Sequence, residues 1–416
     1  MHAVVVGYVW PEPNSSAAGQ NMLNLMTAMV SEGWRVDFLC AAKHSDNAIV
    51  LTDYGVTPHD IVINDASFDS LIAALAPDIV IFDRFMIEEQ FSWRVRQQCP
   101  QALCVLNTED LHALRSARQQ QNKSGEQEVN LHSDLFYREV ASIMRSDITL
   151  LVSEFEQRFL QHNFAINKDD LQVHPLMPQI NSAHAVPDFS QRQDFVFIGS
   201  FRHEPNWDCV RYLKETIWPQ LSQKLKTANL RIYGSYPPPK AMQFHAPKQR
   251  FFVEGWAENA QQTLAAARIC LAPLRFGAGV KGKFLDAFQV GTPCMTTPLG
   301  SEGITDKSNW PGYISESPDD IINHAVRLYT DENAWYLAHQ QALQLRLTPA
   351  CYEAHQQSLI EALVDAHKGL EQRRKRNFVG AMLRHHSHAS TKYMGQWIEA
   401  KTALKKELES KEGGEG

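Results

Sequence analysis

The sequence lacks the cysteine patterns that build a disulfide framework or a zinc ribbon. Its 416 residues contain seven cysteines, an odd number, widely spaced and without a CxxC pair. This spacing disfavours both kinds of structure. Most of the cysteines lie in apolar stretches, so we expect buried, reduced thiols and a cytoplasmic location.

Long apolar runs, a basic leader and an excess of positive charge are also missing. No stretch approaches the ~20 apolar residues that span a bilayer. The chain begins with an apolar run at residues 3–6, which predicts a strand rather than a signal. The formal net charge of −7 argues against a whole-protein nucleic-acid binder. Neither half carries a GxGxxG turn after its first expected strand, which disfavours a dinucleotide-dependent dehydrogenase.

Short apolar segments alternate with helical periodicity along most of the chain, which predicts an α/β fold with parallel sheets covered on both faces. In the first half we expect strands at residues 4–9, 36–40, 61–63, 79–82, 103–106 and 148–152. In the second half we expect them at residues 195–198, 230–233, 251–253, 269–274, 294–296 and 313–315.

The alternation pauses between Pro175 and Ser190, where prolines and polar residues predict a domain boundary. We therefore expect an N-terminal domain at 1–186, a C-terminal domain at 187–350, a helix at 351–370 that packs near the interdomain region, and a tail at 371–416. The tail is basic and either partly helical or disordered. It is either a solvated appendage or a contact for anionic lipid or an acidic partner. Its histidine cluster at 385–388 lacks tetrahedral zinc spacing, and we expect no metal site.

Residues 274–288 combine three glycines, two lysines and a carboxylate where a strand passes into a helix. The backbone at Gly277 and Gly279 can approach an anion closely, and the helix N-terminus adds partial positive charge. Lys281 and Lys283 can neutralise a diphosphate. The alternative is a tight turn followed by a solvated helix edge.

Three further places in the first half offer candidate site residues. Gly19 follows a Pro-Glu-Pro-Asn-Ser-Ser loop at a helix start, where it either admits a phosphate or acceptor or is only a helix-start glycine. Asp110 and His112 follow a strand and face the expected cleft, although such pairs are often salt-bridged surface groups. Asp83 also follows a strand and is a candidate for the acceptor side, unless it only pairs with Arg84 to stabilise a turn.

Several segments together carry a family resemblance. They are residues 11–19, 108–115 and 144–153 in the first half, followed by 197–206, 253–256, 272–283 and 300–303 in the second. In this order they resemble the family 4 glycosyltransferases, and the resemblance covers nearly residues 1 to 350. It implies the GT-B architecture, two Rossmann-like domains facing a central cleft, and a retaining enzyme that uses a nucleotide-sugar donor.

The resemblance also implies roles for individual residues. Arg202 and Lys283, with Lys281 as a further candidate, look like the cations that meet the donor diphosphate. Asp286 stands where many members place a glutamate that binds the ribose. His112 would hydrogen-bond the transferred sugar, and the amides of 277–279 would bind phosphate or sugar oxygens.

One departure from the family pattern concerns the donor sugar. Many members have another glutamate at the position of Ala278. The sugar contacts must then come from the backbone of this loop or from Glu302. The glycine-lysine form of the loop is itself a variant within the family.

The expected activity is therefore transfer of a sugar from a nucleoside-diphosphate sugar to a hydroxyl acceptor, with retention and without a required metal ion or cofactor. A front-face reaction, in which the departing phosphate helps to deprotonate the acceptor, is consistent with the lack of an obvious carboxylate pair at the loop. A nucleotide-binding subunit of a glycan-assembly complex and a nucleotide-sugar epimerase are the alternatives. We expect residues 115–132 to form a polar, mobile acceptor loop.

Overall fold

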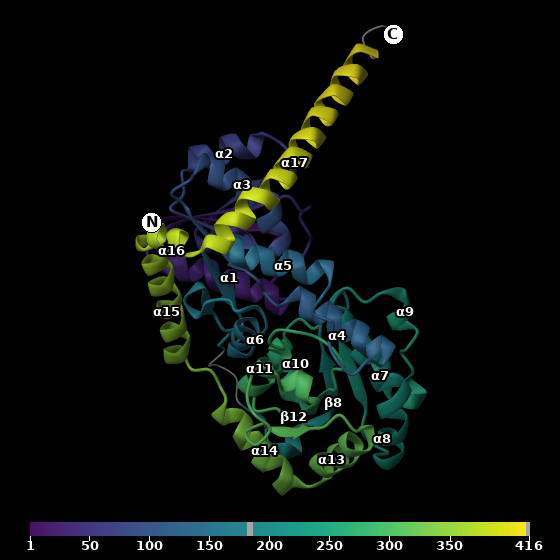
Figure 1. Ribbon diagram of the computed structural model, residues 1–416. Coiled ribbons are helices and arrows are strands. Elements are labelled where there is room, and N and C mark those ends of the chain that lie inside the picture. The colour runs from purple at the N-terminus through teal and green to yellow at the C-terminus, as the bar shows by residue number, and fades with distance from the viewer. Residues whose placement is uncertain (181–185, 413–416) are drawn as a thin grey trace.

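The computed structural model describes residues 1–180 and 186–412. Residues 181–185, part of the expected domain boundary, and the side chains of His386 and His388 lie outside this description. Two parallel sheets, each flanked by helices, form the GT-B architecture that the sequence predicts (Figure 1). Among the described residues, no helix is both long and apolar enough to cross a membrane.

The first sheet has seven strands in the order β3-β2-β1-β4-β5-β6-β7. They are β1 His2–Gly7, β2 Arg35–Cys40, β3 Val56–Asp60, β4 Ile79–Asp83, β5 Leu103–Asn107, β6 Ile148–Leu151 and β7 Leu171–Val173. The strand expected at 61–63 is wrong, because β3 pairs residues 56–60 with 36–40 and leaves Val62 and Ile63 exposed. Pro58 disfavours a strand here in the sequence, but β3 is an edge strand, and edge strands tolerate proline.

The second sheet has six strands in the order β10-β9-β8-β11-β12-β13. They are β8 Gln193–Ile198, β9 Leu230–Tyr233, β10 Phe251–Gly255, β11 Ala267–Ala272, β12 Cys294–Thr296 and β13 Gly312–Ile314. In each sheet the strand order reverses beside the first strand, at the β1/β4 and β8/β11 pairs. Ligands of such sheets bind outside the carboxyl ends of the strands at these reversals.

Helices cover both sheets (Figure 1). In the N-terminal half they are α1 Ala17–Ser31, α2 Ser67–Leu75, α3 Phe85–Gln98, α4 His112–Ser124, α5 Asp134–Arg145 and α6 Glu154–Phe164. The C-terminal half has α7 Glu204–Tyr212, α8 Trp218–Lys224, α9 Pro239–Met242, α10 Ala260–Ala266, α11 Gly282–Gln289, α12 Pro298–Ser301, α13 Pro318–Thr330 and α14 Glu332–Gln344. A π-helical turn, Leu213–Ile217, joins α7 to α8, and short 3₁₀ turns lie at Leu51–Tyr54, Lys168–Asp170, Phe189–Gln191 and Pro247–Gln249.

The chain returns to the first sheet after α14. Helix α15, Pro349–Lys368, buries Leu359 and Leu363 in the core formed by α1 and the first sheet. The Tyr352 hydroxyl donates to Asn24 Oδ1 of α1 over 3.0 Å. The first and last parts of the chain therefore share one hydrophobic core.

The tail is helical over most of its length, with α16 at Leu370–Arg376 and α17 at Phe378–Glu412. Arg374 donates to both carboxylate oxygens of the buried Asp147, over 3.0 and 2.8 Å. Arg376 pairs with Asp169 and Asp170, and Arg373 also pairs with Asp170. These arginines of the basic run are ion-paired to the N-terminal domain, and α17 projects beyond it (Figure 1).

Candidate active site

A cavity of about 770 Å³ lies at the carboxyl ends of both sheets, between the two domains. The candidate residues that line it are Gly19, Asp83, Asp110, His112, Arg202, Gly277, Ala278, Gly279, Lys281, Lys283 and Asp286. Glu302 is the candidate that does not line it. Eleven of the twelve candidate positions therefore line one cavity.

The glycine loop connects β11 to α11 and approaches the N-terminal domain closely. Gly279 has a φ of 64°, in the left-handed region, and a Cβ there would lie 2.7 Å from Asp110 Cβ. Its N–H donates to Glu156 Oε1 over 3.2 Å. A side chain at this position would collide with Asp110, so glycine is required for the contact between the two domains. The Gly279 amide already has a partner in the other domain.

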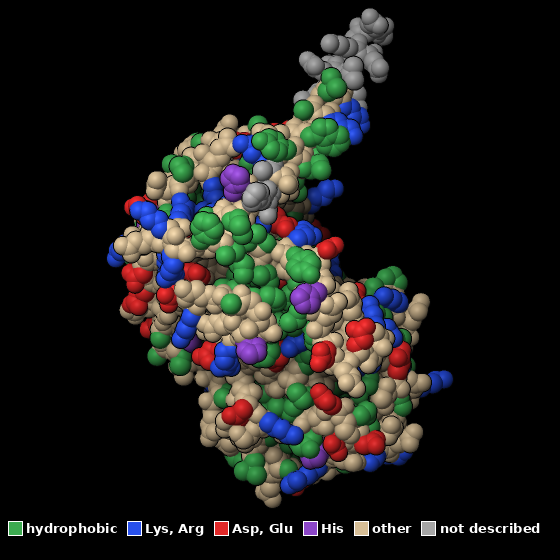
Figure 2. Space-filling view, in the orientation of Figure 1, with side chains coloured by type: hydrophobic (Ala, Val, Ile, Leu, Met, Phe, Trp, Pro, Cys, Tyr) green, Lys and Arg blue, Asp and Glu red, His purple; other side chains and the backbone are tan. Residues whose placement is uncertain are grey.

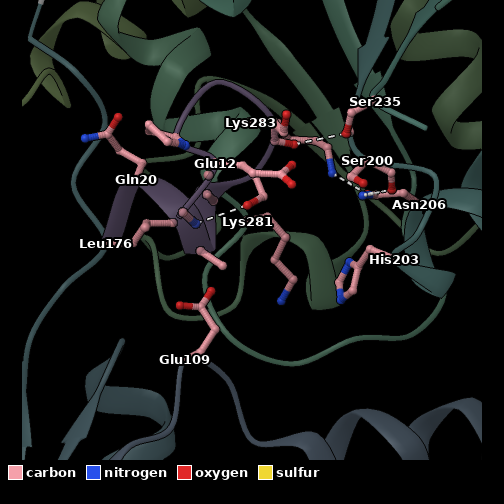
Figure 3. A pocket seen from close by; sticks show the side chains of 18 of the residues that line it. Glu12, Gln20, Glu109, Leu176, Ser200, His203, Asn206, Ser235, Lys281 and Lys283 are labelled. Carbon is pink, nitrogen blue, oxygen red and sulfur yellow. Dashed lines mark hydrogen bonds between the residues drawn. The ribbon is translucent and has the colours of Figure 1, made fainter. Parts of the chain in front are cut away.

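The two lysines of the loop have different environments. Lys283 Nζ donates to Asn206 Oδ1 over 2.7 Å at the cavity wall, and burial lowers its pKa (Figure 3). Lys281 is 8% exposed and donates to the Gly279 carbonyl over 2.8 Å. Burial lowers the pKa of Lys281 to about 8, against the opposing charge of Glu302. Lys283 is therefore the better placed of the two to meet a ligand.

Arg202 lies at the open side of the cavity. Its guanidinium stacks on the Tyr236 ring, 3.4 Å from the ring centroid, and the side chain is otherwise exposed. The Tyr236 hydroxyl donates to Glu12 Oε2 over 2.7 Å, which links the two domains. The aromatic ring holds the cation at the cavity without neutralising it.

Asp286 lies on α11, where its carboxylate accepts a 3.1 Å hydrogen bond from Gln261 Nε2. Burial raises the pKa of Asp286 to about 6, although this hydrogen bond opposes the shift. The carboxylate is ionised at neutral pH and can accept hydrogen bonds from hydroxyl groups.

Gly19 is the third residue of α1. Its N–H donates over 3.1 Å to Oγ of the N-cap Ser16, and an added Cβ would lie 2.4 Å from the carbonyl carbon of Glu12. The glycine is needed where the loop at Glu12 crosses the helix start. Its amide is already hydrogen-bonded within the cap of α1.

Asp110 and His112 follow β5 on the N-terminal wall of the cavity. Burial opposes ionisation of Asp110, yet the charges of Arg115 and His112 lower its pKa to about 2. His112 Nδ1 lies 3.1 Å from Asp110 Oδ1, and burial lowers the histidine's pKa. His112 is therefore mainly neutral at pH 7 and can both donate and accept. The buried Glu139 accepts the backbone N–H groups of His112 and Ala113 over 2.9 and 2.8 Å and fixes this turn.

Asp83 ends β4 beside this turn. Its carboxylate accepts the Tyr8 N–H over 3.3 Å and the Asn107 side-chain amide over 3.4 Å. These bonds join the ends of β1, β4 and β5. Asp83 thus lines the cavity while it holds the strand ends together.

Three further groups, none of them predicted from the sequence, belong to this site. Residues 115–124 are not a mobile loop but part of α4, whose Ala113, Leu114 and Ala117 are buried at helical spacing. Arg118 donates from Nη1 and Nη2 to the two Glu302 oxygens over 2.7 and 2.8 Å, and to the Gly277 carbonyl over 2.9 Å. This pairing explains why Glu302 is held away from the cavity.

The other two missed groups are His203 and Glu109, which both line the cavity. Burial lowers the pKa of His203 to about 3, so it is neutral. Glu109 has a φ of 65° and lies two residues after the end of β5. Both residues lie in segments that carry the family resemblance, 108–115 and 197–206, but their place at the cavity depends on contacts between distant segments. Among the described residues, no group of three or more His, Cys, Asp or Glu side chains could hold a metal ion.

Comparison with known proteins gives a consistent result. Residues 192–331 match the family described as glycosyl transferases group 1. No curated protein sequence matches the chain.

Similar solved structures extend over nearly the whole chain. HepE from Anabaena, solved with UDP and glucose, has a TM-score of 0.66 at 11% identity, covering 88% of this chain and 100% of that one. Sucrose-phosphate synthase from Thermosynechococcus elongatus has a TM-score of 0.63 at 12% identity, with the same coverage. The pneumococcal O-GlcNAc transferase GtfA, solved with UDP and GlcNAc, has a TM-score of 0.62 at 11% identity, covering 88% of this chain and 99% of that one.

Proposed function

We propose that the chain, whose residues 192–331 match the glycosyl transferases group 1 family and whose fold is GT-B, transfers a sugar from a nucleoside-diphosphate sugar to a hydroxyl acceptor with retained anomeric configuration. The observation that carries the proposal is the position of Lys283 and Arg202 on one cavity with Asp110 and His112. The cations lie on the C-terminal side, and the carboxylate-histidine pair lies on the N-terminal side.

The cations fit the charge that develops in this reaction. As the glycosidic bond breaks, negative charge grows on the departing diphosphate, and preorganised positive groups stabilise it. Lys283 and Arg202 supply two such groups, so the proposed reaction has no need of a divalent metal ion. Lys281 acts through the loop, because its ammonium holds the Gly279 carbonyl.

Other residues have proposed roles in donor binding. Asp286 accepts hydrogen bonds from the ribose, and neutral His112 hydrogen-bonds the transferred sugar. The backbone of 277–278 contacts the phosphate or sugar, while the Gly279 amide stays with Glu156. Glu302 contributes through Arg118 and the Gly277 carbonyl. Relatives of the same fold were solved with UDP, which makes a uridine nucleotide the first donor to test.

A thermal-shift screen with UDP-, GDP- and ADP-sugars tests donor binding, because a ligand that binds only the folded state raises its apparent stability. We expect one base to give a clear shift, which Lys283→Met should reduce strongly and Lys248→Met, an exposed lysine outside the cavity, should not. Product analysis by NMR then reads the anomeric configuration. Inversion would contradict retention, an epimerised donor would indicate an epimerase, and binding without transfer would indicate a binding subunit.

We also propose that α17 brings the protein to an anionic membrane surface from a reducing cytoplasm. Since Arg373, Arg374 and Arg376 are ion-paired internally, the exposed face of α17 is the contact. It carries seven exposed residues, Phe378, Val379, Met382, Tyr393, Met394, Trp397 and Leu404. Figure 2 shows hydrophobic side chains on the projecting part of this helix. Described basic groups on this helix are Arg384, Lys392, Lys401 and Lys405, and its described Glu399 is paired with Arg94. An apolar, aromatic and basic helix face suits the interface of an anionic bilayer, whereas a second copy would bring like charge.

Vesicle sedimentation tests this contact with phosphatidylcholine vesicles, with and without phosphatidylglycerol. We expect binding that requires the anionic lipid and is lost in Trp397→Ser/Leu404→Ser. The matched control, Tyr336→Ser/Leu337→Ser, alters two exposed residues of α14 and should leave binding unchanged. Equal sedimentation of both variants would contradict the proposal.

A further inference from the structure

Tyr236 lies after β9 at the open side of the cavity, in a backbone conformation that side chains rarely adopt. Its φ of 57° is in the left-handed region. Such a conformation persists only where the surroundings impose it. Three prolines at 237–239 follow directly and stiffen the turn. The position of the Tyr236 ring is therefore determined by its contacts rather than by local preference.

The Tyr236 hydroxyl contacts two side chains of the N-terminal domain. It donates to Glu12 Oε2 over 2.7 Å and accepts from Asn47 Nδ2 over 2.9 Å. The other Glu12 oxygen accepts the Ser45 hydroxyl, so the carboxylate is itself held in place. Both the donor and an acceptor site of the tyrosine hydroxyl are thus used by the other domain.

Two neighbouring hydrogen bonds join the same parts of the two domains. Ser235 Oγ donates to the Ser15 carbonyl over 3.2 Å, and Trp256 Nε1 donates to the Asn14 carbonyl over 3.3 Å. Both acceptors belong to the loop before α1 that contains Glu12. Glu12 and Ser235 border the cavity (Figure 3). Bonds of this length exist only while the two domains are in contact, so they would be lost if the cavity opened.

The ring of Tyr236 supports a cation on its face. The Arg202 guanidinium lies 3.4 Å from the ring centroid. Arg202 is exposed and has no ion pair shorter than 4 Å within the described part of the chain. A guanidinium stacked on an aromatic face keeps its charge and its N–H donors. The ring therefore orients Arg202 without using the groups that would bind a phosphate.

We propose that Tyr236 is a positioning residue that couples closure of the two domains to the placement of Arg202. Glu12 and Asn47 fix the tyrosine ring only when the domains are in contact, and the fixed ring places the guanidinium at the cavity. The proposal rests on the proposed function, because it takes the departing diphosphate to lie against Arg202. When the domains separate, the ring loses both partners and the cation loses its fixed position.

The affinity for the departing group reports this placement. A free nucleoside diphosphate carries on its distal phosphate the charge that develops during the reaction, so it interacts most strongly with a correctly placed cation. A nucleoside monophosphate lacks that phosphate. A general loss of structure would weaken the binding of both nucleotides, whereas a misplaced Arg202 should weaken only that of the diphosphate.

The test measures the Kd of both nucleotides in the full chain by isothermal titration calorimetry. The base is the one whose nucleotide sugar gives the largest thermal shift. Tyr236→Phe keeps the ring but loses both hydrogen bonds, so the Kd of the diphosphate should rise about tenfold while that of the monophosphate stays within about twofold. Tyr236→Leu also removes the ring and should raise the Kd of the diphosphate as far as Arg202→Met does.

Tyr236 and Arg202 should behave as one unit. The Kd of the diphosphate in Arg202→Met/Tyr236→Leu should equal that in Arg202→Met alone, because the ring acts only through the cation. Tyr212→Phe and Tyr212→Leu are the matched controls. Arg275 lies over the Tyr212 ring, 4.8 Å from its centroid, and neither residue lines the cavity. Both controls should bind the two nucleotides as the wild type does.

Variants of Glu12 test the coupling from the other domain, and they decide the matter if Tyr236→Leu does not fold. Glu12→Ala should weaken diphosphate binding about as much as Tyr236→Phe, whereas Glu12→Gln keeps an acceptor for the hydroxyl and should restore most of the affinity. Additive losses for Arg202 and Tyr236, or a Tyr236→Phe protein with the wild-type affinity for the diphosphate, would overturn the coupling. A wild type that binds no nucleotide and no nucleotide sugar would instead overturn the proposed function.

Discussion

The two walls of the cavity differ in the sign of the charge that they present. The C-terminal wall offers Lys283 and Arg202, held by a neutral amide and an aromatic ring. The N-terminal wall offers Asp83, Glu109 and Asp110, with two of its carboxylates paired and one available. In the proposed reaction the departing diphosphate lies against the first wall, where preorganised cations stabilise its charge.

This difference explains why the same residue type has unequal roles at the site. Lys281 and Lys283 are two positions apart, but one ammonium is used to hold the Gly279 carbonyl and the other faces the cavity. Position relative to the two walls, rather than residue type, decides which lysine meets the donor.

The largest effect is expected when the positive wall loses the lysine that faces the cavity. Lys283→Met should reduce kcat/KM by a factor of about 10²–10³, the range found when one group that stabilises transition-state charge is removed. Lys281→Met should reduce it by less than about tenfold, because the lost bond stabilises the loop by about 1 kcal/mol. Steady-state kinetics and urea unfolding of both variants check this order; equal losses would contradict the distinction.

A second variant should push the two walls of the cavity apart at the contact between Gly279 and Asp110. Gly279→Val places side-chain atoms where a Cβ already lies 2.7 Å from Asp110, at a φ of 64°. We expect a loss of about 10² in kcat, since a displacement of about 1 Å is sufficient for that. Gly125→Val is the matched control, because its φ of 73° imposes similar backbone strain with no atom within 4 Å. If both variants lose activity equally, strain and not the contact is responsible.

A smaller effect is expected when the Arg118 contacts between the two domains are removed. Arg118→Ala breaks the bidentate pair with Glu302 and the bond to the Gly277 carbonyl. Because both side chains are largely buried, we expect a roughly tenfold rise in the donor KM, equivalent to about 1.4 kcal/mol. Arg158→Ala breaks the exposed pair with Glu154 and should change nothing measurable.

The last prediction concerns the stability of the fold rather than the activity. Burial raises the pKa values of Glu139 and Glu156 to about 8, above the ordinary glutamate value. The folded state therefore binds more protons than the unfolded chain, and stability should fall as pH rises from about 4.5 to 8, by at most about 1.4 kcal/mol per pH unit for each group. Urea unfolding at several pH values measures the slope, and Glu139→Gln/Glu156→Gln should flatten it.

Local pattern was sufficient to predict the alternating strands and the glycine loop, because buried strands and strand-to-helix turns have signatures within a few residues. It was insufficient for α4, whose polar residues hid the three buried positions. It also could not show that Lys281 is enclosed, that Glu302 is held by Arg118, or that Glu109 faces the cavity. Those facts depend on residues more than a hundred positions apart or on the meeting of two domains.

The return of α15 to the first core means that the donor-binding domain is attached to the rest of the protein at two points. One connection enters before β8 and the other leaves after α14. A body attached in this way turns mainly about the line through its attachments, whereas a single linker would permit rotation in any direction. Two attachments restrict the directions in which the C-terminal domain can turn against the first domain, and so constrain where Lys283 lies relative to the N-terminal wall.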